Sequence, residues 1–324
     1  MNTIELLGEE ETFKNIVEHE ITEFEDNKID VIRYYAFYNC TGLTKASFPV
    51  ATRIGQVAFQ GCSGLTSVSF PNATSIGDSA FLSCSGLTNV SFPNATSIGS
   101  GAFSDCSGLT KISFPNATSI GDNAFYNCSG LTEASFPLAT SIGNWAFYNC
   151  NGLTSVSFPK ATSIGSGAFN GCSNLTKVSF LVATSISERA FSFCSGLTSV
   201  SFLVATSIGR EAFNGCSSLI SVSIPKATSI GQSAFSGCSK LTEVSFPVAT
   251  SIGISAFDGC SKLTTIYVGT NTSTICKLSN TNAFKNCTNL ANIYVPATLV
   301  DDYKIATNWS SFASKIKPYE QPVG

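Results

Sequence analysis

Cysteine is the residue type in this chain with the widest possible chemistry, because thiolates bind metals, exchange disulfides and attack electrophiles. Eleven of the 13 cysteines are spaced 22 residues apart, and a twelfth follows after 27, so one repeat carries a five-residue insertion. These twelve ladder cysteines are Cys40, Cys62, Cys84, Cys106, Cys128, Cys150, Cys172, Cys194, Cys216, Cys238, Cys260 and Cys287. Zinc sites need cysteines two to four residues apart, and no such pair occurs. The spacing therefore predicts copied structural units, with no metal and no cofactor.

The oxidation state of the ladder is a separate question. If successive units stack like strands, neighbouring thiols lie about 5 Å apart, which is within disulfide range. Free cysteine, however, is among the most buried residue types and packs as a small hydrophobe. We expect reduced, buried ladder thiols, with bridges as the open alternative. Cys276 lies in the insertion, outside the ladder, and is the thiol we expect to be reactive.

Groups for acid–base or nucleophilic catalysis are scarce. The only histidine is His19, near the N-terminus. Carboxylates in the repeats are isolated: Asp78 and Asp122 share a repeat position but lie two units, or about 10 Å, apart. The Ile-Gly pairs are lone glycines and do not form a phosphate-binding loop. We therefore predict a protein without catalytic residues, which is not an enzyme.

One repeat, residues 65–86, shows how each unit is built. Leu65, Val68 and Phe70 alternate with polar residues, which predicts a short strand that ends at Pro71. Residues 73–76 predict a second short extended piece, and residues 80–84 fit one helical turn. The remaining inward positions are Ile76, Phe81 and the small fillers Ala80 and Cys84. The fold class that follows is a repeat solenoid, mainly β with short helical turns, with about twelve repeats between N- and C-terminal caps.

The repeat Leu-x-x-Val-x-Phe-Pro-x-Ala-x-x-Ile-Gly-x-x-Ala-Phe-x-x-Cys resembles the BspA-like leucine-rich repeats of bacterial and some protozoan proteins. The resemblance covers residues 31–296. It implies a leucine-rich-repeat right-handed coil. It also implies a role at the cell surface or outside the cell, in binding host matrix proteins or in adhesion. Short arrays of this kind also resemble accessory proteins carried with phage tail genes.

Composition divides the chain into four parts. Residues 1–31 form an acidic segment and cap, with ten acids against two bases in residues 1–30; residues 32–296 form the solenoid. Residues 297–317 predict a helical C-terminal cap, and residues 318–324 a disordered tail. No basic segment followed by an apolar run starts the chain, so we expect no signal peptide, and no apolar run reaches the length of a membrane span. The 13 bases of residues 31–296 are scattered, so we expect no nucleic-acid partner and no membrane insertion, and we expect a monomer.

A partner that docks on a repeat array needs residues that differ between units, because a uniform surface cannot fix a register. Such variation is greatest at the positions that follow Ile-Gly and Ala-Phe. The candidate partner-binding residues there are Tyr126, Asn144, Trp145 and Tyr148. The Thr and Ser positions of the first strand are the alternative surface. We predict a binding scaffold that recognises a protein or glycan. The alternative is a structural or accessory part of a larger assembly, such as a phage-tail-like particle.

Overall fold

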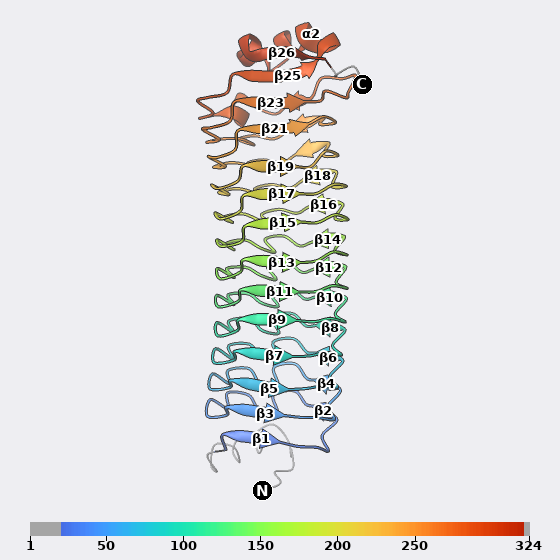
Figure 1. The fold of residues 1–324 in the computed structure, drawn as a ribbon, viewed down its shortest axis with the longest axis vertical. Helices are drawn as coiled ribbons and strands as arrows, with labels where there is room; N and C mark the ends of the chain where they lie inside the picture. The colour runs from blue at the N-terminus through green and yellow to red at the C-terminus, as the bar shows by residue number, and fades with distance from the viewer. Residues whose placement is uncertain (1–20, 321–324) are drawn as a thin grey trace. The chain divides into compact units, whose positions relative to one another are not determined.

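The computed structural model describes residues 21–320. The chain forms two compact units, Met1–Ala161 and Thr162–Gly324. Each unit is a stack of coils in which every coil contributes two short parallel strands (Figure 1). This confirms the predicted solenoid built mainly of β-strands.

In unit 1 the first strand of each coil belongs to one seven-stranded parallel sheet, and the second strands form another sheet. Neighbouring strands pair with an offset of one repeat, as in Ser67↔Asn89 and Ile76↔Ile98. The first-strand sheet contains β1 (Glu23–Glu25), β3 (Lys45–Ser47), β5 (Ser67–Ser69), β7 (Asn89–Ser91), β9 (Lys111–Ser113), β11 (Glu133–Ser135) and β13 (Ser155–Ser157). The second-strand sheet contains β2 (Val31–Ile32), β4 (Arg53–Ile54), β6 (Ser75–Ile76), β8 (Ser97–Ile98), β10 (Ser119–Ile120) and β12 (Ser141–Ile142).

Unit 2 repeats this plan with three- and four-stranded sheets of first strands. The five-residue insertion is absorbed between β22 and β25, since Ser251 pairs with Lys277 and Thr265 pairs with Asn292. The first strands are β15 (Lys177–Ser179), β17 (Ser199–Ser201), β19 (Ser221–Ser223), β21 (Glu243–Phe246), β23 (Thr265–Val268) and β25 (Asn292–Pro296). The second strands are β14 (Ser163–Ile164), β16 (Ser185–Ile186), β18 (Ser207–Ile208), β20 (Ser229–Ile230), β22 (Ser251–Ile252) and β24 (Lys277–Leu278).

The segment that follows the second strand of each coil does not form the expected helical turn. In residues 77–84 the amides of Ala80, Leu82 and Cys84 close tight i→i+3 turns. The amides of Ser79, Phe81 and Ser83 instead donate to carbonyls of the next coil. Ser79 and Ser83 have φ of 53° and 60°, which interrupts any helix. The sequence spacing suited a helix, but the hydrogen bonds between coils are satisfied by a chain of turns instead. In the part of the chain that the structure describes, the only helix at this position is the 3₁₀ turn η1 (Thr281–Phe284).

Two columns of phenylalanine fill the centre of each unit. In unit 1 Phe37 and Phe59 stack with ring centroids 4.8 Å apart, and in unit 2 the Phe169–Phe191 distance is 5.3 Å. The second column packs against the first at an angle, as in Phe136–Phe147 at 6.0 Å. These rings are removed from solvent, so the predicted inward columns are confirmed.

The glycine after each isoleucine is required by the close approach of neighbouring coils. A Cβ added at Gly121 would lie 2.6 Å from the backbone of Gly99 and Ser100. A side chain at Gly121 would force the backbones apart, which explains why the Ile-Gly pair recurs in most coils. Ser187 occupies the equivalent position in one coil, and its Oγ donates to the carbonyl of Ile164.

A C-terminal cap closes unit 2. It consists of η2 (Ala297–Leu299), α2 (Val300–Ile305), η3 (Ser310–Lys315) and the strand β26 (Ile316–Tyr319), which pairs with β25 (Figure 1). Helical turns thus occupy residues 297–305 and 310–315 of the segment for which we expect a helical cap, 297–317. The disordered tail predicted for 318–324 was wrong for Pro318 and Tyr319, which are held in β26; residues 321–324 lie outside the described part. Near the N-terminus, β1 extends the first-strand sheet, and Phe24 packs on Phe37 and Phe48.

Candidate binding surfaces

The predicted partner-binding residues gather on one side of unit 1, on the turns that follow Ile-Gly and Ala-Phe. Tyr126 and Tyr148 stack with ring centroids 4.7 Å apart, and Trp145 meets Tyr148 edge-on at 5.5 Å. All three rings are half-buried. We call Tyr126, Trp145 and Tyr148 the aromatic edge. Trp145 has φ of 56°, in the left-handed region. Equivalent residues with similar φ range from Ser79 and Asn123 to Arg189 and Glu211, so the turn accepts side chains of different sizes.

Carboxylates and amides border the aromatic edge. Asp122 accepts hydrogen bonds from the backbone amide of Asn144 at 2.7 Å and from its Nδ2 at 3.3 Å. On the neighbouring turn, Asp105 accepts from Asn127 Nδ2 at 3.0 Å. Burial, followed by the proximity of Tyr148 and Asp105, raises the pKa of Tyr126. The edge therefore combines exposed ring surface with acceptors, and Asn144 lies at its border.

A second group of aromatic side chains, which we did not predict from the sequence, lies near the N-terminal end of unit 1. Tyr34 and Tyr35 lie edge to face with ring centroids 4.1 Å apart, and Tyr35 and Tyr38 with centroids 4.9 Å apart. These three tyrosines occupy the same repeat positions as Asn144, Trp145 and Tyr148, five repeats earlier. The equivalence of position was the signal that could have revealed them.

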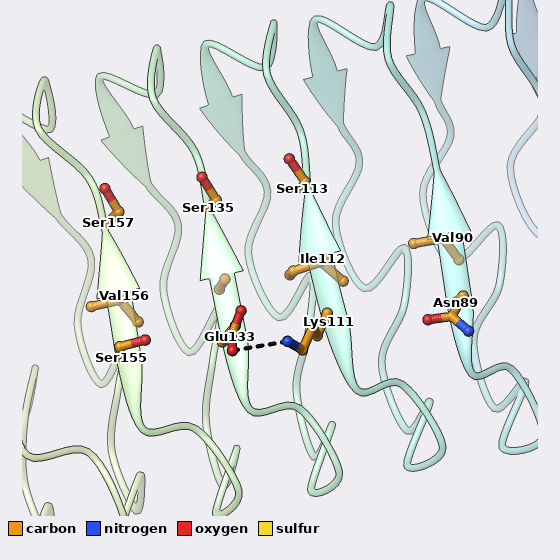
Figure 2. A pocket seen from close by; sticks show the side chains of 11 residues that line it. Asn89, Val90, Lys111, Ile112, Ser113, Glu133, Ser135, Ser155, Val156 and Ser157 are labelled. Atoms are coloured by element: carbon orange, nitrogen blue, oxygen red, sulfur yellow. Dashed lines mark ion pairs between the residues drawn. The ribbon is translucent and has the colours of Figure 1, made fainter.

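A shallow groove crosses the first-strand sheet of unit 1 (Figure 2). Its volume is about 540 Å³, which falls in the range of small-molecule sites. Lys111 and Glu133 face each other across adjacent strands and form an ion pair at 3.0 Å. The small Ala134 stands where the neighbouring coils have Ile112 and Val156, and this substitution was the available signal. The lining residues are Asn89, Val90, Lys111, Ile112, Ser113, Glu133, Ala134, Ser135, Ser155, Val156 and Ser157.

The groove lies on the Thr/Ser surface that was the alternative binding surface. The threonine hydroxyls beside it are used in folding, since Thr132 Oγ1 donates to the carbonyl of Thr110 at 2.9 Å and Thr154 Oγ1 to that of Thr132 at 3.1 Å. The paired Lys111 and Glu133 leave little net charge there. We therefore place less weight on this surface than on the aromatic edge.

The cysteines serve packing within each unit. The ladder thiols are buried, and most donate to the phenylalanine carbonyl of the preceding coil, as Cys106 does to Phe81 at 3.0 Å. Burial raises the pKa of Cys128, Cys194 and Cys216. All 13 thiols are free in the structure, as expected.

The prediction that Cys276 is the reactive thiol was wrong. Its side chain is fully buried, and burial raises its pKa to about 12. The cap covers it: the Cys276 amide donates to Tyr303 Oη, and Trp309 Nε1 donates to the Cys276 carbonyl, both at 2.7 Å. Cys276 thus belongs to the cap interface, whereas Asn271, Ser273 and Thr274 of the same segment are exposed.

Over residues 21–320, no group of three or more His, Cys, Asp or Glu side chains is arranged to hold a metal ion. His19 lies outside that range. None of the helices within it has the length and apolarity needed to cross a membrane.

Comparison with known families assigns the repeat. The family described as "BspA type Leucine rich repeat region (6 copies)" matches residues 9–132, 118–206 and 206–308. The chain belongs to this family. Membership accounts for the 22-residue period, the inward Leu, Val, Phe and Ile columns and the Ala-Phe turn.

Solved structures of bacterial leucine-rich repeat proteins are similar. One from Bacteroides ovatus is 25% identical, with a TM-score of 0.67 over 93% of this chain and 84% of that chain. A leucine rich cell surface protein from Faecalibacterium prausnitzii is 24% identical, with a TM-score of 0.46 over 91% of each chain. The T. pallidum leucine rich repeat protein is 29% identical, with a TM-score of 0.46 over 48% of this chain and 78% of that chain. No curated protein sequence is a significant match.

Proposed function

We propose that this BspA-type chain is a non-catalytic scaffold that recognises a protein or glycan in adhesion or another surface interaction. The observation that carries the proposal is the aromatic edge. Tyr126, Trp145 and Tyr148 present ring surface to solvent at positions where the repeat needs only small residues. Tryptophan and tyrosine are enriched where partners bind, because they contribute large contact areas at a small entropic cost.

Other coils support this proposal, because they have serine at the position of Trp145 and at the shared position of Tyr126 and Tyr148. Ser79 stands in the Trp145 column with φ of 53°, and Ser104 stands in the Tyr126 and Tyr148 column. The backbone of the turn therefore does not depend on an aromatic side chain. An aromatic side chain that exposes apolar surface and has no role in folding is best explained by binding to a partner.

A non-catalytic role fits the chemistry of the described surfaces. The groove holds one exposed ion pair, with both side chains more than half accessible, which is a solvated arrangement. Burial raises the pKa of ladder thiols such as Cys128 and Cys216, and both side chains lack access to solvent. The family resemblance favours a location at the cell surface, and we include that location in the proposal.

The test is a binding screen of the full chain on a glycan array and on immobilised matrix proteins. The variant Tyr126→Ser, Trp145→Ser, Tyr148→Ser is screened in parallel. We expect each ligand found to lose affinity about tenfold or more in the triple variant, because hot-spot aromatics contribute about 2 kcal/mol or more each.

Two control variants keep the result specific. Tyr34→Ser, Tyr38→Ser removes rings from the second aromatic group, and Lys111→Ser, Glu133→Ser removes the ion pair of the groove. A ligand that ignores the aromatic edge but loses affinity in the groove variant would transfer the site to the Thr/Ser surface. Absence of any ligand would favour the structural or accessory role.

A further inference from the structure

Unit 2 carries a different aromatic feature, on the first-strand sheet near the C-terminal cap. The outward position that holds serine in earlier coils, such as Ser223 and Ser245, holds tyrosine in the last two. Tyr267 and Tyr294 are direct partners on β23 and β25, and their rings stack at 4.9 Å with an interplanar angle of 12°. Tyr319 of β26 meets Tyr267 edge-on at 5.6 Å.

Among residues 21–320, the aromatic neighbours of Tyr267 are Tyr294, which stacks on one ring face, and Tyr319. The strand order is β21-β23-β25-β26, so Tyr294 and Tyr319 both approach Tyr267 from the cap side. On the opposite side Tyr267 pairs with the small, exposed Ser245 of β21. The large Tyr267 side chain therefore stands beside the small Ser245 side chain, which makes a step in the sheet surface. We call this arrangement the Tyr267 step.

A carboxylate borders the step. Glu243 is exposed on β21, two residues before Ser245, and forms no ion pair with any described residue. Burial first, and then the charge of Glu243, raise the pKa of Tyr267, which places the carboxylate within electrostatic reach of the phenol. The nearby Lys317 is directed elsewhere, since its Nζ donates to Asn292 Oδ1 at 2.5 Å.

The same combination occurs independently in unit 1. Tyr126 stacks on Tyr148 of the following coil, and its own column holds the small Ser104 in the preceding coil. Asp105 follows Ser104 in the sequence. After burial and Tyr148, its charge contributes to the raised pKa of Tyr126, as the charge of Glu243 contributes to that of Tyr267. Trp145 packs against Tyr148 and not against Tyr126. In both units a tyrosine stacks on an aromatic ring of the following coil and has a serine and a carboxylate in the preceding coil, although Ser104 is buried whereas Ser245 is exposed. Neither carboxylate forms an ion pair with a residue in the range 21–320.

We propose that the Tyr267 step binds a cationic side chain, arginine or lysine, presented by a protein partner. The face of an aromatic ring carries negative electrostatic potential and attracts a cation within about 6 Å of its centroid. The carboxylate of Glu243 supplies the matching charge, and arginine suits it best because its planar guanidinium can lie on the ring while it donates to the carboxylate. A neutral sugar would gain the ring contact but leave the carboxylate charge uncompensated.

The probe is a blocked peptide, Gly-Gly-Arg-Gly-Arg-Gly-Gly, titrated into the full chain labelled with 3-fluorotyrosine. The chain has nine tyrosines, and the Tyr267→Phe variant assigns the fluorine resonance of Tyr267. A peptide with citrulline in place of arginine has the same shape without the charge. We expect the arginine peptide to shift the Tyr267 resonance in a saturable way and the citrulline peptide to leave it in place.

Glu243→Gln should weaken the arginine peptide about two- to fivefold, as loss of a charge beside a cation–π contact does. Its matched control is Glu133→Gln, which removes a carboxylate from the same repeat position in a coil whose following coil has Ser157 where Tyr267 stands beside Glu243. An equal shift with citrulline, equal losses in both glutamine variants, or a shift with maltoheptaose alone would overturn the proposal. The Tyr126, Trp145, Tyr148 triple variant should keep the Tyr267 shift, so failure of the aromatic edge and failure of this site are separable.

Discussion

Aromatic residues divide into two populations in this chain. Phenylalanines of the two inward columns are buried, while the tyrosines and Trp145 of the two proposed binding surfaces keep part of their rings exposed. Phe193 lies outside the inward columns and is 58% exposed. The difference is positional: a ring directly after alanine in Ala-Phe points into the coil, and a ring one residue later lies on the surface. The sequence alone allowed this division to be predicted, because the inward column never changes residue type whereas the outward column does.

Phe147→Ala tests the inward column. Phe147 stacks on Phe125 at 5.2 Å and packs against Phe136 and Phe158 at 6.0 and 5.8 Å. Removing it leaves a cavity in a rigid stack, so we expect the free energy of unfolding to fall by about 3–5 kcal/mol. Urea denaturation followed by circular dichroism measures the change. A loss below about 1 kcal/mol would show that the ring does not support the core.

The thiols give a second residue-scale prediction. Cys287 ends the ladder and is its most exposed member at 8%, and the hydrogen bond offered by Cys260 lowers its pKa. Thiolate is the reactive form, so iodoacetamide should modify Cys287 first in native protein, faster as the pH rises, and should leave Cys276 unmodified. Mass spectrometry identifies the sites. After denaturation without reductant all 13 cysteines should react; fewer would reveal disulfides and contradict the reduced ladder.

At the scale of elements, the strands were easier to predict than the turns. Alternation of apolar and polar residues is a property of one chain segment and identifies β5 or β9 directly. The Ala80–Cys84 segment has spacing that suits a helix, and its true conformation depends on bonds to the next coil that a single repeat cannot reveal. The cap strand β26 was not predicted for the same reason. Its sequence has no clear strand pattern, and it forms a strand by pairing with β25.

Gly121→Ala tests the close stacking of coils. The added Cβ would press on the backbone of Gly99 and Ser100 at 2.6 Å, so neighbouring coils must move apart. We expect a loss of more than about 1 kcal/mol in the free energy of unfolding. Gly42→Ala is the matched control, because a Cβ there meets nothing within 4 Å. Equal unfolding midpoints for the two variants would show that the glycine column does not set the coil spacing.

For the molecule as a whole, the repeat period predicted the solenoid, the inward columns and the location of the candidate residues. The meeting of Tyr126, Trp145 and Tyr148 followed from stacking equivalent positions. The sequence did not predict the groove, the Tyr34 group or the Tyr267 step. Each depends on unusual residues in one or two coils and on the residues that lie beside them in neighbouring coils. Burial of Cys276 also depended on a distant segment, the cap residues Tyr303 and Trp309.

We propose that the aromatic edge is not required for folding and is therefore free to bind a partner. Urea unfolding of the Tyr126→Ser, Trp145→Ser, Tyr148→Ser variant, measured beside Phe147→Ala, tests it most directly. Serine already occupies both repeat positions in other coils, so we predict that the triple variant unfolds within about 1 kcal/mol of the native chain, as surface substitutions do. A loss comparable to that of Phe147→Ala would show that the three rings belong to the core and would contradict the account.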